Sequence, residues 1–280
     1  MNRLIRVGFC LVMSTAAARA QQPGPAFTPA PAAAVSPEQM NAAFGIPLWG
    51  GSGLWSEPIA DVAERLKARE ESLADGAASY RARADAILGI APETIRLIGK
   101  DGKTDSVLVL FANKGDTLGL EPKPADYASP KEYRDALRGF QDRKQKLART
   151  IAGQGAGIEK ALATLLGPSA TQRFGAGGKM TEWVKTWQWD GHVFLLSEQK
   201  DESLSLRIVP PAAAAARGRA ERVSDGDLKA ELKTRVLRRE NGDVIVTGIP
   251  MIDQGRKGYC VPATWARYLR YMGIPADEYT

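Results

Sequence analysis

The sequence predicts an α+β domain with a mixed or antiparallel sheet, followed by a linker and the start of a second domain. Three observations lead to this prediction. An apolar fraction of 44% over 280 residues is sufficient for one large or two modest globular domains. Short apolar runs alternate with Asp-Gly and Asn-Gly pairs, which favour tight turns between neighbouring strands. Charged segments carry apolar residues every three or four positions, which is typical of amphipathic helices.

Residues 1–20 have the pattern of a secretory signal peptide, with arginines before a short apolar run and the small-x-small cleavage pattern Ala18-Arg19-Ala20. We therefore expect export to the periplasm or the extracellular space. No later run approaches the ~18 apolar residues of a spanning helix, so no integral membrane segment is expected after signal removal. The signal takes three of the 38 Lys and Arg but none of the 32 Asp and Glu, so the net charge falls from +6 to +3. We expect no nucleic-acid partner from so small an excess.

The N-terminal part of the mature chain is predicted to be a tether followed by helices. Residues 21–47 are rich in Pro and Ala, which is typical of a flexible tether. Within this range, Ser36-Pro37-Glu38-Gln39 is a good start for a short helix to about Phe44. A second helix is expected from Ser56, and its apolar face comprises Ile59, Val62, Ala63 and Leu66.

An accessory α+β domain is expected over residues 48–209. Its first two predicted strands, Thr94–Ile98 and Ser106–Ala112, flank the Asp101-Gly102 turn. The second of these strands is apolar throughout its middle, which predicts a central strand covered on both faces. The remaining predicted strands are Thr181–Asp190, Val193–Glu198 and Leu204–Val209, with a turn at Asp190-Gly191.

Two helices are expected between these groups of strands. Ser129-Pro130 opens a long charged helix to about Ile151, and Glu159–Leu166 forms another. The glycines at positions 153, 155 and 157 are interpreted as the break between them.

A linker with some helix is predicted over residues 210–232, which begin with Pro-Pro and a run of alanines. The final region, 233–280, starts with a hairpin in which Thr234–Arg239 and Val244–Gly248 flank Asn241-Gly242.

A cysteine at the start of a predicted helix is the most informative feature of the final region. Cys10 leaves with the signal peptide, so Cys260 is the single thiol of the mature chain and forms no internal disulfide. The helix that follows has its expected apolar face at Trp265, Ala266, Leu269 and Met272. A helix N-terminus favours the thiolate form of a cysteine, which is the nucleophilic form.

The stretch from Gln254 to Trp265 resembles the papain-like cysteine peptidases, in particular their bacteriocin-processing branch. The resemblance rests on Gln254, six positions before Cys260, and on the glycines at 255 and 258. It implies that Cys260 is the nucleophile and that Gln254 contributes to the oxyanion hole. It further implies a substrate-approach loop of Gly255, Gly258 and Tyr259. A peptide or protein substrate is expected, without a metal or other cofactor.

The general base of such a peptidase is absent from the expected place. The family places its histidine well after the cysteine, whereas the one histidine here, His192, lies upstream and is interpreted as a surface or edge-strand residue. We therefore expect the chain to be an incomplete part of a longer peptidase, inactive as given. The alternative is a secreted, non-catalytic binding or scaffolding protein whose active part is residues 48–209. One His and two Cys exclude zinc sites built on several imidazoles or on four thiolates.

Overall fold

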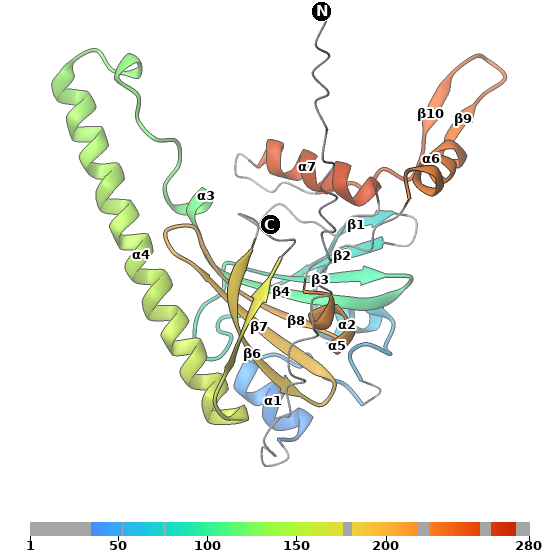
Figure 1. Ribbon diagram of the computed structural model, residues 1–280, viewed down its shortest axis with the longest axis horizontal. Coiled ribbons are helices and arrows are strands. Elements are labelled where there is room, and N and C mark those ends of the chain that lie inside the picture. Colours follow the sequence, from blue (N-terminus) through green and yellow to red (C-terminus); the bar gives the residue numbers. More distant parts are fainter. Residues whose placement is uncertain are drawn as a thin grey trace, which may run out of the picture. The chain divides into compact units, whose positions relative to one another are not determined.

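An eight-stranded antiparallel sheet forms the centre of the α+β fold, in the order β1-β2-β3-β4-β8-β7-β6-β5 (Figure 1). The computed structural model describes residues 35–51, 53–74, 77–175, 181–217, 224–252 and 259–272. All of them belong to one unit of the chain, residues 31–280. The predicted signal peptide lies outside the described residues. The α+β class and the antiparallel sheet predicted from the sequence are confirmed.

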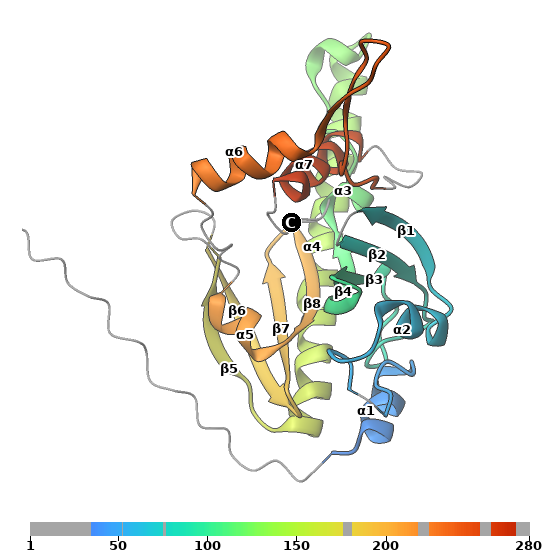
Figure 2. The same cartoon turned by 90° about the vertical axis from the view of Figure 1, so that its right-hand side faces the viewer.

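Two meanders of four strands make up the sheet, and Figure 2 shows one in each half of it. The first meander comprises β1 (Arg69–Ala74), β2 (Ala77–Ala82), β3 (Thr94–Lys100) and β4 (Lys103–Asn113). The second comprises β5 (Ala170–Phe174), β6 (Glu182–Trp189), β7 (His192–Gln199) and β8 (Ser203–Val209). The meanders join where β4 pairs with β8, with Val109 opposite Leu206.

Two of the strand connections are the tight turns that the sequence predicts. Asp101 and Gly102 between β3 and β4 have φ of 51° and 76°, and Asp190 and Gly191 between β6 and β7 have φ of 42° and 71°. Positive φ at both central positions is the feature of the turn whose twist matches that of the flanking strands. Glycine adopts this conformation without steric cost, and aspartate tolerates it better than most residues.

The sheet is buried on both faces at its centre. Side chains alternate along β4, and both alternate sets are buried. One set packs with α1, α2 and α4 in the larger apolar cluster. A smaller cluster joins strands β5–β8 to the short helix α5 (Pro211–Ala216). The prediction of a central strand covered on both faces is therefore confirmed.

A single helix of 37 residues, α4 (Pro130–Leu166), replaces the two predicted helices. Ser129 caps it by accepting a hydrogen bond from the Glu132 amide, as its sequence suggests. The interpretation of the glycine run as a break is wrong. A Cβ at Gly155 would lie 2.7 Å from Glu198 Oε2. A Cβ at Gly157 would lie 3.1 Å from Ile90 Cδ1. These glycines thus let an unbroken helix lie close to the sheet and its connecting loop.

The first helix, α1 (Pro37–Phe44), has the predicted capping box: Ser36 Oγ accepts from the Gln39 amide, and Gln39 Oε1 accepts from the Ser36 amide. Met40 and Phe44 have no exposed surface and lie in the larger cluster. The part of the predicted tether, 21–47, that the structure describes therefore belongs to the core. Its apolar residues are few but fall on one helical face, which Pro and Ala content alone does not reveal.

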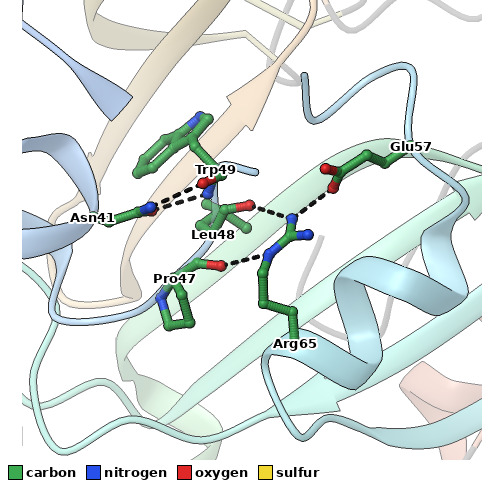
Figure 3. Close-up of polar contacts among 6 residues, drawn as sticks. All are labelled: Asn41, Pro47, Leu48, Trp49, Glu57 and Arg65. Atoms are coloured by element: carbon green, nitrogen blue, oxygen red, sulfur yellow. Dashed lines mark hydrogen bonds and ion pairs between the residues drawn. The ribbon is translucent and has the colours of Figure 1, made fainter. Parts of the chain in front are cut away.

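A network of polar contacts fixes the chain between α1 and α2 (Figure 3). It joins Asn41, Pro47, Leu48, Trp49, Glu57 and Arg65. Arg65 donates to the carbonyl oxygens of Pro47 (2.8 Å) and Leu48 (2.9 Å) and forms an ion pair with Glu57 (2.6 Å). The Asn41 side chain bonds both the amide and the carbonyl of Trp49, each at 2.9 Å. The segment after α1 is thus held from both sides.

The second helix, α2 (Ile59–Arg65), begins later than predicted. Its N-cap is Pro58, which makes no side-chain capping bond, so the prediction of a cap at Ser56 is wrong. The chain at 58 instead forms an isolated bridge with Lys103, so the helix starts only after this contact. The predicted apolar face of the helix is buried, as expected.

The strands β1, β2 and β5 were not predicted, and in β1 a charged residue occupies a position that is usually apolar. The Glu71 and Arg96 side chains are 3% and 1% exposed, and their atoms Oε2 and Nε lie 2.8 Å apart. Arg81 also forms an ion pair with Glu71. A buried position in β1 therefore carries a charge instead of an apolar side chain.

The remaining elements are short. Between β4 and α4 lie α3 (Lys114–Thr117) and the 3-10 helix η1 (Pro124–Asp126). After α5 come α6 (Asp225–Thr234), the paired strands β9 (Val236–Arg238) and β10 (Val244–Val246), and α7 (Cys260–Tyr271). The predicted hairpin around Asn241-Gly242 is thus confirmed. Among the described helices, none combines the length and the apolar character needed to cross a bilayer.

Candidate functional site

The predicted site residues divide into described and undescribed ones. Tyr259 and Cys260 are described, and Cys260 is the first residue of α7. Gln254, Gly255 and Gly258 lie outside the described residues. The oxyanion role of Gln254 and the glycine-rich approach loop therefore stay predictions.

Cys260 is an exposed free cysteine at the N-terminal end of α7. The first intrahelical bond runs from the Ala263 amide to the Tyr259 carbonyl at 2.8 Å. No side-chain hydrogen bond caps this end of α7 in the described part of the chain. Amides in the first turn of a helix lack intrahelical acceptors, and the helix dipole is positive there. The thiol thus lies at a place that favours negative charge, and α7 contains no acidic residue.

Tyr259, the residue before Cys260, contacts the C-terminal end of β4 and the helix α3 that follows it. The Tyr259 hydroxyl accepts a hydrogen bond from Asn113 Nδ2 at 2.9 Å. The same hydroxyl donates to Asp116 Oδ1 at 2.6 Å. Asn113 is the last residue of β4 and Asp116 lies in α3. The eight-stranded sheet therefore fixes the start of the cysteine-bearing helix directly.

The rest of α7 is held by polar contacts at two further points. Arg267 Nε donates to the Pro250 carbonyl at 3.0 Å. Arg235 Nη1 donates to the Tyr271 carbonyl at 3.0 Å, and its guanidinium lies 5.1 Å from the Tyr271 ring centroid. Carbonyls at a helix C-terminus lack intrahelical donors, so the arginine satisfies one of them.

The predicted apolar face of α7 is right at Ala266 and wrong at Trp265, while Leu269 and Met272 are half-buried. Ala263 and Ala266 are buried, whereas Trp265 is 60% exposed. The attachments at Tyr259 and Arg267 set the rotation of the helix about its axis. The small alanines face inward at that rotation, which leaves Trp265 outside.

The single histidine belongs to the core of the eight-stranded sheet. His192 is 4% exposed, at the start of β7 and between β6 and β8. Its ring lies among three tryptophans, with centroid separations of 5.3 Å to Trp189, 5.1 Å to Trp55 and 5.9 Å to Trp49. The interpretation as a surface or edge-strand residue is therefore wrong. A turn position suggested exposure, but the aromatic residues of α1–α2 and β6 cover it.

Burial determines the protonation of His192. It lowers the pKa of His192 below its ordinary 6.5, against the raising effects of the Trp189 and Asp190 backbone and the Asp190 charge. Nδ1 lies 3.2 Å from the Trp189 carbonyl oxygen, which only accepts, so the neutral ring carries its proton on Nδ1. Nε2 has no hydrogen-bond partner among the described residues. Among the described residues, no hydrogen bond or ring contact joins His192 to Cys260.

The residues that sequence reasoning missed are Asn113 and Asp116. The sequence Asn113-Lys114-Gly115-Asp116 after an apolar strand is a typical turn signal. That signal indicates where the strand ends, but it gives no information about a contact with a tyrosine more than 140 positions later.

No protein-family model, curated protein or solved structure matches this chain. Among the described residues, no group of three or more His, Cys, Asp or Glu side chains is arranged to hold a metal ion.

Proposed function

We propose that this chain carries the nucleophile of an exported cysteine peptidase, which hydrolyses peptide bonds through an acyl-enzyme on Cys260. The observation that carries the proposal is the location of this exposed thiol at the first residue of α7. A thiolate is the attacking species, and a helix N-terminus stabilises it. The signal-peptide pattern of residues 1–20 supports export to the periplasm or the extracellular space.

The reaction proceeds by two acyl transfers. Cys260 Sγ forms a bond to the carbonyl carbon of a peptide substrate, and the C–N bond breaks as the amine leaves with a proton. Water then attacks the thioester, which releases the acid and restores the thiol. The Cys260 amide and, by resemblance, the Gln254 side chain donate hydrogen bonds to the oxyanion, a donor role worth about 3–4 kcal/mol. This chemistry uses no cofactor.

His192 is not the general base of this reaction. Its ring is enclosed by tryptophans and its Nδ1 bonds a backbone carbonyl, while the thiol is exposed. The 280 residues contain no other histidine, so the proposal assigns no general base among them. These residues are accordingly proposed to acylate but to deacylate slowly.

A suitable experiment separates thiol reactivity from acyl transfer. The full chain is treated with iodoacetamide, which alkylates without an oxyanion, and with a peptidyl p-nitrophenyl ester, whose good leaving group needs no general acid. Mass spectrometry of the Cys260 peptide gives both rates. We expect faster alkylation in the folded chain than in the same chain in denaturant, together with stable acyl-Cys260.

Substitution of the predicted oxyanion donor sharpens this test. Gln254→Ala should lower the rate of ester acylation about 10²-fold and leave alkylation unchanged, while Lys257→Ala serves as the neighbouring control. Equal alkylation rates in the folded and denatured chain, with no acyl-Cys260, would overturn the proposal. That outcome favours the alternative, a secreted non-catalytic binding or scaffolding protein whose active part is residues 48–209.

A further inference from the structure

We propose that Asn113 at the end of β4 and Asp116 in α3 are positioning residues for Cys260, and that they act through the hydroxyl of Tyr259. The inference rests on the proposed function, because it concerns the reactivity of the same thiol. It assigns the N-terminal domain a role in the reaction at the cysteine.

The Tyr259 hydroxyl is held from two sides. Asn113 Nδ2 donates to it at 2.9 Å, and it donates to Asp116 Oδ1 at 2.6 Å. A phenol hydroxyl has one proton to give, so the carboxylate determines the direction of that bond and the amide occupies a lone pair. The bond to a charged acceptor is of the stronger, charge-assisted kind. The orientation of the tyrosine ring is thereby defined.

The turn that carries the two partners of this hydroxyl is itself held by hydrogen bonds. Asn113 pairs with Ser203 across the central strands, and its Oδ1 accepts from the Gly115 amide at 2.8 Å. The Lys114 amide donates to the Glu202 carbonyl at 2.7 Å, and their side chains form an ion pair. The turn that carries Asn113 and Asp116 is thus tied to the start of β8.

Close approach at this point requires a glycine. A Cβ at Gly115 would lie 2.8 Å from the Tyr259 hydroxyl oxygen and 3.3 Å from the ring carbon that carries it. The first distance is shorter than real Cβ contacts, so a side chain at 115 would displace the tyrosine. The sequence therefore provides both the partners for the hydroxyl and the space that it occupies.

The two hydrogen bonds of the Tyr259 hydroxyl fix the residue from which α7 begins. The Tyr259 carbonyl accepts the first intrahelical hydrogen bond, from the Ala263 amide, and one peptide bond joins Tyr259 to Cys260. The first turn of a helix frays readily unless it is capped, and no side chain caps this one in the described part of the chain. Tyr259 takes the place of that cap, because its side-chain hydrogen bonds fix the residue that precedes the helix. The amides that favour the thiolate keep their orientation only while this turn is ordered.

The experiment removes a hydrogen bond of the Tyr259 hydroxyl by changing either the tyrosine or its partner. Tyr259→Phe deletes the hydroxyl, and Asn113→Asp keeps the acceptor for the Gly115 amide while it loses the donor to Tyr259. Both rates at Cys260 are measured in the full chain, with iodoacetamide and with the p-nitrophenyl ester. We expect each variant to lower the alkylation rate by about two- to fivefold. Tyr268→Phe, an exposed tyrosine of the same helix, is the matched control and should leave the rates unchanged.

A double variant distinguishes positioning from a general loss of stability. Tyr259→Phe with Asn113→Asp should be no slower than Tyr259→Phe alone, because the second change acts only through the missing hydroxyl. Gly115→Ala provides a third route to the same displacement if Tyr259→Phe does not fold. Unchanged rates in folded variants, or additive effects in the double variant, would overturn the inference. A different outcome would contradict the proposed function alone. In that outcome the unmodified chain is not acylated by the ester, but the variants still lower the alkylation rate.

Discussion

The eight-stranded domain, residues 35–217, and the C-terminal segment, the described residues from 224 to 272, are held together in different ways. In the domain, apolar side chains are buried, and Leu120 and Trp183 are the large exposed ones. The C-terminal segment exposes nine: Val236, Leu237, Val244, Val246, Ile249, Met251, Val261, Trp265 and Tyr268. Neither apolar cluster of the described residues includes a side chain after Ala214.

The difference teaches that the two regions depend on different forces. Burial of apolar surface stabilises the domain. The C-terminal segment is fixed by polar contacts at a few points: Tyr259 with Asn113 and Asp116, Arg267 with Pro250, and Arg235 with Tyr271. Such contacts define position well, but each contributes little net free energy. Substitutions in the two regions should therefore differ sharply in cost.

The largest expected effect is at the buried ion pair of the domain. Glu71→Gln removes the carboxylate beside Arg96, and we expect a loss of about 3–5 kcal/mol in the free energy of unfolding, because the buried guanidinium loses a charged partner. Glu231→Gln breaks the exposed pair with Arg235 in the C-terminal segment and should cost about 0–1 kcal/mol. Urea unfolding measures both, and equal costs would remove the distinction between the regions.

The next effect is a cavity in the centre of the sheet. Leu206 on β8 has no exposed surface, so Leu206→Ala should lower the free energy of unfolding by about 2–5 kcal/mol. Leu120→Ala, at a residue that is 94% exposed, is the control within the same domain and should cost less than about 0.5 kcal/mol. A loss below about 1 kcal/mol at Leu206 would show that the core is loosely packed.

A pH-dependent effect is expected at His192. Because the folded chain has the lowered pKa, the unfolded chain binds more protons between that pKa and the ordinary 6.5. Stability is therefore fully present above pH 6.5 and declines as the pH falls below it, by at most about 1.4 kcal/mol per pH unit. His192→Phe removes the titrating group and should flatten this part of the curve. The measurement is the urea midpoint against pH, and parallel curves for the two proteins would contradict the assignment.

The smallest expected effect is in the exposed hairpin. Leu237 on β9 is 50% exposed, and Leu237→Ala should change the free energy of unfolding by less than about 0.5 kcal/mol. Comparison with Leu206→Ala keeps the chemistry of the substitution constant and changes only the region. If the two cost the same, the hairpin packs against a surface in solution, and the contrast between the regions fails.

Local signals in the sequence were sufficient for much of the fold. The Asp-Gly and Asn-Gly turns, the capping box of α1 and the apolar strand β4 are each determined by neighbouring residues, and they were predicted correctly. The glycines of α4 were misinterpreted because their role depends on Glu198 and Ile90, which come from other parts of the fold. The strand β1 escaped prediction because its inward position carries Glu71, paired with Arg96.

The candidate site was predictable to a smaller extent. The start of α7 at Cys260 follows from local features, since Pro262 suits a first turn and apolar residues recur at helical spacing. The rotation of α7 does not follow from them, because contacts at Tyr259 and Arg267 with distant residues determine which side faces inward. The aromatic surroundings of His192 likewise combine tryptophans from two separate segments, the chain between α1 and α2 and the strand β6.

The junction of the two meanders has a consequence for the order of folding. Strands within each meander are neighbours in sequence and can pair early, whereas β4 meets β8 through residues about a hundred positions apart, such as Val109 and Leu206. Closing that pair carries the largest loss of chain entropy in the sheet. We expect the two halves of the sheet to form first and the central pairing to be the slow step, with α4 already shortening the path between them.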